Sequence, residues 1–162
     1  MHMTRRSGGA GRDAVVDAVL GASRVLVAVA ARSLGGIGED VTLTQYRTLV
    51  VLASRGPQTV AALAEAVDVA PPTATRMSDR LVRKGLVVRR HDTTDRRLVR
   101  LTLSPAGRRL VDTVTGRRRA EIAALLAGIP AAQQAALVDA LQQLAEAAGE
   151  VPEQDWSAGW DL

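Results

Sequence analysis

A single segment of the sequence has the alternating pattern of a β-hairpin, in a chain whose other periodic segments are helical. The runs "LVVRRH" (residues 86–91) and "RRLVRLTL" (residues 96–103) are separated by the four residues "DTTD". Side chains alternate along a strand, so Val99, Leu101 and Leu103 share one face of the second run. This face can cover a helical core while the other meets solvent or a ligand. The segment predicts a small β element on a helical domain.

Two short helices joined by a tight turn are predicted immediately before the hairpin. Thr59 is the expected N-cap of a helix over "VAALAEAV". Pro71 and Pro72 fit the first positions of the next helix, which ends at Gly85, because amides there have no intrahelical acceptor. On this second helix the residues expected to face outward are Thr75, Arg76, Asp79, Arg80 and Arg83, and those expected to be buried are Ala74, Met77 and Leu81. A helix pair with a basic second helix, followed by a basic hairpin, predicts a winged helix.

Long apolar helices are predicted on both sides of this unit, over about residues 13–32 and 104–148. The first leaves most of its circumference to Val, Leu and Ala, so it needs burial on several sides. One small domain can hardly supply that burial, which implies a partner subunit. A symmetric dimer places two DNA-binding units about one helical turn of DNA apart. The predicted fold class is mainly α with a small β wing, a winged helix-turn-helix with long N- and C-terminal dimerisation helices.

The predicted domain plan is a single unit between two tails, which suits a chain of 162 residues. A flexible tail is expected over residues 1–12, one domain over 13–148 and an acidic tail over 149–162. The winged helix occupies about residues 44–103 of that domain. Thr44 is the expected N-cap of its first helix.

The charge of the chain is unevenly distributed. The net charge is +4, but residues 76–109 hold eleven Arg or Lys against three Asp, a local charge of +8. Residues 149–162 carry four acidic side chains and no basic one. Local basic density of this kind is expected of a protein that binds a polyanion. A solvated arginine-rich face is the alternative interpretation of the charge alone.

Three segments in a fixed order carry a family resemblance: "LTQYRTLVVLASRGPQTVAALAEAVDV" (43–69), "TATRMSDRLVRKGLVVRR" (73–90) and "DRRLVRLTLSPAG" (95–107). They closely resemble the MarR family of bacterial transcriptional regulators, and the resemblance covers essentially residues 13–148. Its most specific motif joins an Asp-Arg-Arg triplet to alternating aliphatics, a Leu-hydroxyl pair and a glycine. The residues of this motif are Asp95, Arg96, Arg97, Leu103, Ser104 and Gly107.

The resemblance implies a homodimer that binds double-stranded DNA, with the second helix of the pair in the major groove. Carried over residue by residue, the implied DNA-facing residues of this helix are Thr73, Thr75, Arg76 and Arg80. The last of these is expected on a phosphate or a base. This chain departs from many relatives at Ala70 and Pro72, which replace a hydroxyl and a small polar residue. The departures remove a capping bond and one DNA donor at the helix tip.

The hairpin, called the wing from here on, is expected to reach the flanking minor groove. By the resemblance Arg97 enters that groove, where A·T-rich narrowing concentrates negative potential. Arg96 and Arg100 are expected on phosphates, which strengthen binding without specifying sequence. We expect Asp95 to pair with and orient a wing arginine, and Asp92 to help close the turn.

Many members of the family release DNA when a small, often phenolic or otherwise anionic, molecule binds between the dimer helices and the winged helix. The resemblance therefore implies a repressor relieved by an effector. Arg24, Tyr46 and Arg47 are the candidate effector residues in this chain. The alternatives are a core position for Tyr46 and a solvated or paired Arg24. The absence of cysteine excludes thiol redox sensing.

Other function classes find little support. No phosphate-binding glycine loop is present, and the two histidines, His2 and His91, cannot form a zinc pair, so we expect no enzyme, cofactor or metal. A winged helix that binds protein instead of DNA is the alternative, although its recognition face would be apolar rather than basic. The first residues lack the apolar stretch of a signal peptide, and the uncharged run 122–138 is broken by Gly128 and Pro130. A cytoplasmic protein without membrane contact is expected.

Overall fold

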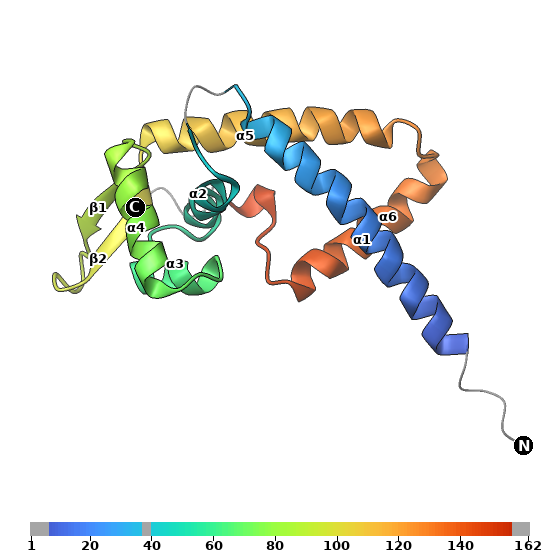
Figure 1. The fold of residues 1–162 in the computed structure, drawn as a ribbon, viewed down its shortest axis with the longest axis horizontal. Coiled ribbons are helices and arrows are strands. Elements are labelled where there is room, and N and C mark those ends of the chain that lie inside the picture. The colour runs from blue at the N-terminus through green and yellow to red at the C-terminus, as the bar shows by residue number, and fades with distance from the viewer. Residues whose placement is uncertain (1–6, 37–39, 157–162) are drawn as a thin grey trace, which may run out of the picture.

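Six α-helices and one two-stranded antiparallel sheet make up residues 7–36 and 40–156, which the computed structural model describes (Figure 1). The elements in chain order are α1 (Ser7–Leu34), α2 (Leu43–Arg55), α3 (Val60–Ala66), α4 (Pro71–Arg83), β1 (Val87–His91), β2 (Val99–Leu103), α5 (Pro105–Leu126), α6 (Ala131–Ala147) and the short 3-10 helix η1 (Glu153–Asp155). The predicted fold class, mainly α with a small β wing, is confirmed. The first helix begins at Ser7, so part of the segment expected to be a flexible tail is helical.

Side-chain caps set the starts of three helices. The N-cap of α2 is Thr42 rather than the predicted Thr44, because Gln45 stands at the third helical position and completes a capping box. The hydroxyl of Thr42 accepts from the amide of Gln45, whose side chain accepts from the amide of Thr42, both at 3.2 Å. Thr59 caps α3 as predicted, and Ser104 caps α5. The α4 helix begins after Ala70 without a side-chain cap, as the sequence indicates.

Two turns of the same kind orient α4. After α3 the chain turns at Asp68, a non-glycine residue with φ of 52°, which an aspartate tolerates better than most residues. After α4 it turns at Gly85, where φ is 69°. There the amide of Gly85 donates to Val82 and the amide of Leu86 donates to Leu81, which is a Schellman motif. The end of α4 is thus fixed where β1 begins.

The hydrophobic core lies among α2, α3, α4, the sheet and the first half of α5. Its largest fully buried side chains include Leu49, Leu52, Leu63, Leu81, Leu101, Val111 and Val114. Ala74, Met77 and Leu81 of α4 are buried as predicted. The core therefore holds one face of α4 and leaves the opposite face in solvent.

The wing pairs Val87 with Leu103 at its base and His91 with Val99 at its far end. The second strand is shorter than predicted, because Arg96, Arg97 and Leu98 belong to the loop and not to β2. Gln58, in the α2–α3 connection, adds a short antiparallel bridge to Leu101, which the sequence did not reveal. Its backbone exchanges hydrogen bonds of 3.1 and 2.7 Å with that leucine. This bridge anchors the base of the wing to the helical core.

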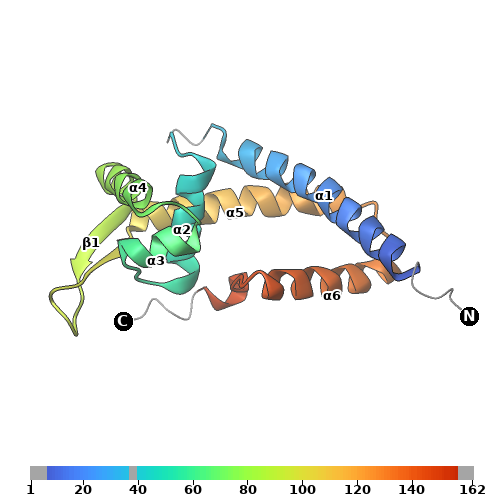
Figure 2. The same ribbon diagram turned by 60° about the horizontal axis from the view of Figure 1, so that its bottom comes forward.

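Three long helices extend away from the winged helix to the other end of the molecule (Figure 2). The ion pair between Arg32 and Glu121 and a 3.0 Å hydrogen bond from Arg117 to the Gly35 carbonyl join α1 to α5. Many apolar side chains of the three long helices are exposed, for example Val15, Leu20, Leu125, Leu141 and Leu144. The stretch Gly11–Leu34 is long and apolar enough to cross a membrane by length and composition, and of its residues only Val29 and Ser33 are buried. Sequence reasoning missed this property because it searched only for uncharged runs.

The start of α5 packs very close to the backbone of Leu86. A Cβ atom on Gly107 would overlap the Leu86 carbonyl oxygen and lie 3.1 Å from the Leu103 side chain. No residue other than glycine fits this position without movement of the backbone. The glycine of the family motif therefore has a packing role.

Replacing Gly107 with Ala should lower the free energy of unfolding by about 3 kcal/mol, because overpacking against backbone cannot be relieved by a side-chain rotation. The matched control is Gly116→Ala in the same helix, where a Cβ has no neighbour within 4 Å. That variant should be more stable by about 1 kcal/mol. Urea unfolding measures both. Equal stability of Gly107→Ala and the parent would contradict the packing argument.

Candidate nucleic-acid interface

The exposed face of α4 carries all four residues that the family resemblance assigns to the major groove. Thr73, Thr75, Arg76 and Arg80 are each exposed. Three of them, at positions 73, 76 and 80, follow the i, i+3, i+7 spacing of one helical row. Arg76 donates to the Thr73 hydroxyl at 3.4 Å, and the Thr75 hydroxyl donates to the Pro71 carbonyl at 3.1 Å. The Arg76 guanidinium thus lies beside a small hydroxyl side chain on an open surface.

Asp92 organises the loop at the tip of the wing. Its Oδ1 accepts from the amides of Thr94 and Asp95 at 2.8 and 3.1 Å, and its Oδ2 forms an ion pair with Arg100. The hydrogen bond from Arg100, followed by those from the two amides, lowers the pKa of Asp92 from 3.8 to about 2. The predicted turn-closing role of Asp92 agrees with this geometry.

Asp95 is predicted to pair with and orient a wing arginine, and in the structure it contacts the backbone of Arg97. Its Oδ1 accepts from the backbone amide of Arg97 at 3.0 Å rather than from an arginine side chain. An amide two residues downstream is within easy reach of an aspartate, whereas a long guanidinium arm extends into solvent. In the described part of the wing the carboxylate that pairs with a guanidinium is Asp92, and its partner is Arg100. Arg100, predicted on a phosphate, is therefore already engaged within the wing.

Arg96 and Arg97 project from the loop and are both exposed. The backbone beneath them is held in place, because His91 donates from Nδ1 to the Arg96 carbonyl at 3.0 Å and Leu98 donates to the Asp95 carbonyl at 2.9 Å. Among the residues described in the structure, no carboxylate pairs with either guanidinium. Their charge remains available to a ligand.

An ion pair between Arg89 and Asp79 joins β1 to α4. Sequence reasoning placed both residues in a basic surface and missed the pair, because residues ten apart on a helix and a strand have no common periodicity. The side chains are 44% and 43% exposed, so the pair contributes only about 0.5 kcal/mol to stability. Its consequence is geometric, because it links the wing directly to α4, which is the helix that the family resemblance assigns to the major groove and is called the recognition helix below.

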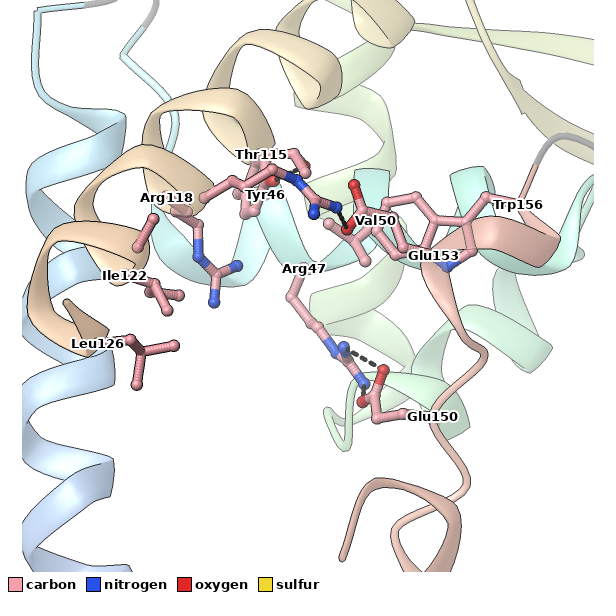
Figure 3. Close-up of a pocket in the computed structure, with 12 residues that line it drawn as sticks. Tyr46, Arg47, Val50, Thr115, Arg118, Ile122, Leu126, Glu150, Glu153 and Trp156 are labelled. Carbon is pink, nitrogen blue, oxygen red and sulfur yellow. Dashed lines mark hydrogen bonds and ion pairs between the residues drawn. The ribbon is translucent and has the colours of Figure 1, made fainter. Parts of the chain in front are cut away.

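A cavity of about 690 Å³ lies between α2, α5 and residues 150–156 (Figure 3). Tyr46 and Arg47 both line it. Tyr46 also has the core position of the alternative interpretation, at 4% exposure, and its hydroxyl is 3.2 Å from that of Thr115. Arg24 is not among its lining residues and is exposed on α1, so the structure does not bring it to Tyr46 and Arg47. The lining residues that sequence reasoning missed include Arg118, Arg119, Ile122, Leu126, Glu150, Glu153 and Trp156.

Comparison with known proteins identifies the family. A sequence model of the MarR family matches residues 41–99. The HTH-type transcriptional repressor MdtR of Bacillus subtilis is 31% identical over 121 residues, which are 75% of this chain and 78% of MdtR. The chain belongs to the MarR family. RV1404 from Mycobacterium tuberculosis is another similar protein, with 40% sequence identity. Its crystal structure matches this one with a TM-score of 0.80 over 92% of this chain and 99% of RV1404.

A MarR family protein from Bacillus stearothermophilus shares the fold at 22% identity, with a TM-score of 0.75 over 91% of this chain and 99% of that one. The family assignment makes the present protein a DNA-binding transcriptional regulator. The basic helix and wing of this MarR-family chain are therefore its candidate DNA interface.

The lowered pKa of Asp92 predicts how the wing responds to acid. A carboxylate whose pKa is depressed by folding contributes stability above its unfolded value of 3.8, and that contribution is lost as the pH falls through about 2. An NMR titration of the Asp92 carboxyl carbon should give a midpoint near pH 2. The control variant Arg100→Gln should move the midpoint upward. A parent midpoint near 3.8 would show that the pair with Arg100 does not form in solution.

Proposed function

We propose that this protein is a homodimeric repressor that inserts α4 into the major groove of DNA and the wing into the flanking minor groove. The observation that carries the proposal is the set of exposed cations on α4 and the wing loop with no acidic partner in the described residues: Arg76, Arg80, Arg96 and Arg97. Cations held on a rigid scaffold and left without counter-ions are suited to phosphates and base edges. The alternative, a winged helix that binds only protein, would require an apolar face in their place.

The cations divide between base recognition and backbone contact. Arg76 lies near the start of α4 and is placed to reach a base edge, with Thr73 and Thr75 beside it. Arg97 lies at the wing tip and suits a narrow minor groove. Arg96 and Arg80 suit phosphates. Arg100 is a supporting residue of the wing, because its side chain pairs with Asp92.

A second copy of this chain accounts for the apolar surface of the long helices. Side chains such as Val16, Leu20, Leu141 and Leu144 are about half exposed. Contiguous exposed apolar surface of this kind marks an interface in soluble proteins. Dimerisation also accounts for the apolar character of Gly11–Leu34 without a membrane, which agrees with a cytoplasmic regulator.

Repression and its relief rest on two further observations. MdtR, which is 31% identical, is named a transcriptional repressor. The cavity between α2 and α5 combines guanidinium groups with apolar side chains, which suits a small organic anion. Such a molecule bound there would be the effector that releases DNA.

The DNA interface predicts a steep dependence on salt. If 6 to 10 phosphates are contacted, log K should fall against log salt with a slope of about −5 to −9. The measurement is a titration of a DNA fragment from the region upstream of the protein's own gene at several salt concentrations.

Arg97→Ala should weaken binding mainly at sites with A·T-rich flanks, whereas Arg76→Ala should reduce discrimination between sequences.

Two outcomes of this titration would count against the proposal. A flat salt dependence, or no binding to any fragment, would remove DNA as the partner. Equal losses on every sequence for both variants would show that these arginines contact only phosphates.

The dimer predicts a molecular mass near twice the 17.1 kDa of one chain. Leu141→Lys should shift the protein to the monomer, because a charge cannot be buried in an apolar interface without a partner. The control is Leu98→Lys on the wing loop, where the leucine has a similar exposure of 43% against 49%. Light scattering after size exclusion measures the masses. A monomeric parent, or an unchanged mass for Leu141→Lys, would contradict this interface.

A further inference from the structure

The segment after α6 packs against the winged helix instead of extending into solvent. Gly149, with φ of 70°, lets the amides of Gly149 and Glu150 donate to the carbonyls of Glu146 and Ala145. These bonds form a Schellman motif that ends the helix and redirects the chain. Arg55 of α2 donates to the Gly149 carbonyl at 3.2 Å. Residues 149–156, the C-terminal segment, thus lie along α2 (Figure 1).

Two carboxylates of this segment form ion pairs with arginine side chains that line the cavity. Glu150 forms a two-bond ion pair with Arg47, with one N–H···O distance of 3.1 Å. Glu153 pairs with Arg119 at 2.7 Å. A third lining cation, Arg118, has no acidic partner among the described residues. The segment therefore covers two of the three cationic positions open to an anionic ligand.

The segment also supplies one wall of the cavity. Trp156 packs against the hydrophobic core, and its indole Nε1 donates to the Val151 carbonyl at 3.0 Å. The apolar side chains Val50 of α2 and Ile122 and Leu126 of α5 also line the cavity, and they remain there when the segment detaches. The space thus suits a molecule with a carboxylate and an aromatic or aliphatic body.

The contacts are weak enough to be exchanged. The paired side chains of Glu150 and Arg47 are each 40% exposed, and those of Arg119 and Glu153 are 72% and 44% exposed. Exposed ion pairs contribute little to stability, so another carboxylate can replace them at small cost. The segment belongs to the same chain, so it is always present near the cavity. It lowers the apparent affinity for a free ligand, because the ligand binds only those molecules in which the segment has left the cavity.

We propose that the C-terminal segment is an internal ligand of this cavity, whose Glu150 and Glu153 carboxylates compete with a small organic anion for Arg47 and Arg119. This inference rests on the proposed effector site and adds its regulation. Binding of the anion displaces the segment, and the segment sets the anion concentration at which the protein responds.

Benzoate is a suitable probe. The chain has two tryptophans, and the substitution Trp160→Phe leaves Trp156 as the single fluorescent reporter. Fluorescence titration and calorimetry of the full-length protein give the dissociation constant. Glu150→Gln and Glu153→Gln should each bind benzoate about three-fold more tightly, and the double variant about ten-fold, because each removes one exposed competing pair. The matched control is Asp155→Asn, which removes the same charge from a residue that does not line the cavity.

A measurement without any probe tests the docking itself. Acrylamide should quench Trp156 more strongly in the double variant than in the parent or in Asp155→Asn, because the indole leaves the core edge when the segment detaches. Unchanged quenching would overturn the proposal. So would equal benzoate affinity in all variants, an equal gain in the control, or no benzoate binding by any variant. DNA binding of the parent is measured separately, so failure of the proposed DNA function would appear there and not in these titrations.

Discussion

The structure depends on one contact, where the end of α4, the base of the wing and the start of α5 meet. Ser104 donates from its hydroxyl to the Gly85 carbonyl at 2.5 Å and from its amide to the Leu86 carbonyl at 3.0 Å, and its hydroxyl accepts from the Gly107 amide at 3.0 Å. Only a glycine at 107 allows α5 to come this close. The recognition helix, the wing and the long helix of the proposed dimer are therefore fixed relative to one another at one place.

Aspartates decide which arginines of the basic segment remain free. Asp92 holds Arg100 within the wing, and Asp79 links Arg89 to α4. Arg76 and Arg80 on α4 and Arg96 and Arg97 on the wing loop are exposed and have no acidic partner among the described residues. The acidic residues that interrupt the basic run thus build a support for the others, so local charge density overstates the number of cations available to DNA.

Sequence reasoning predicted the elements that depend on local signals. Thr59, Pro71 and Gly85 mark the ends of their helices through capping and backbone preferences, and alternation located the wing. It missed two contacts that depend on tertiary geometry, the Arg89–Asp79 pair and the Gln58 bridge, and it grouped Arg24 with Tyr46 and Arg47, which the structure does not do. The return of residues 149–156 to α2 was also missed, because a charged tail has no periodicity that shows where it packs.

The central claim is that two identical winged helices read DNA about a two-fold axis. Sequencing of genomic fragments recovered with the purified protein tests it most directly. The account predicts a shared inverted repeat whose half-sites are centred about 10 base pairs apart, one helical turn, with A·T-rich flanks where the wings lie. Recovered fragments with no common sequence, or with a single unrepeated half-site, would contradict it.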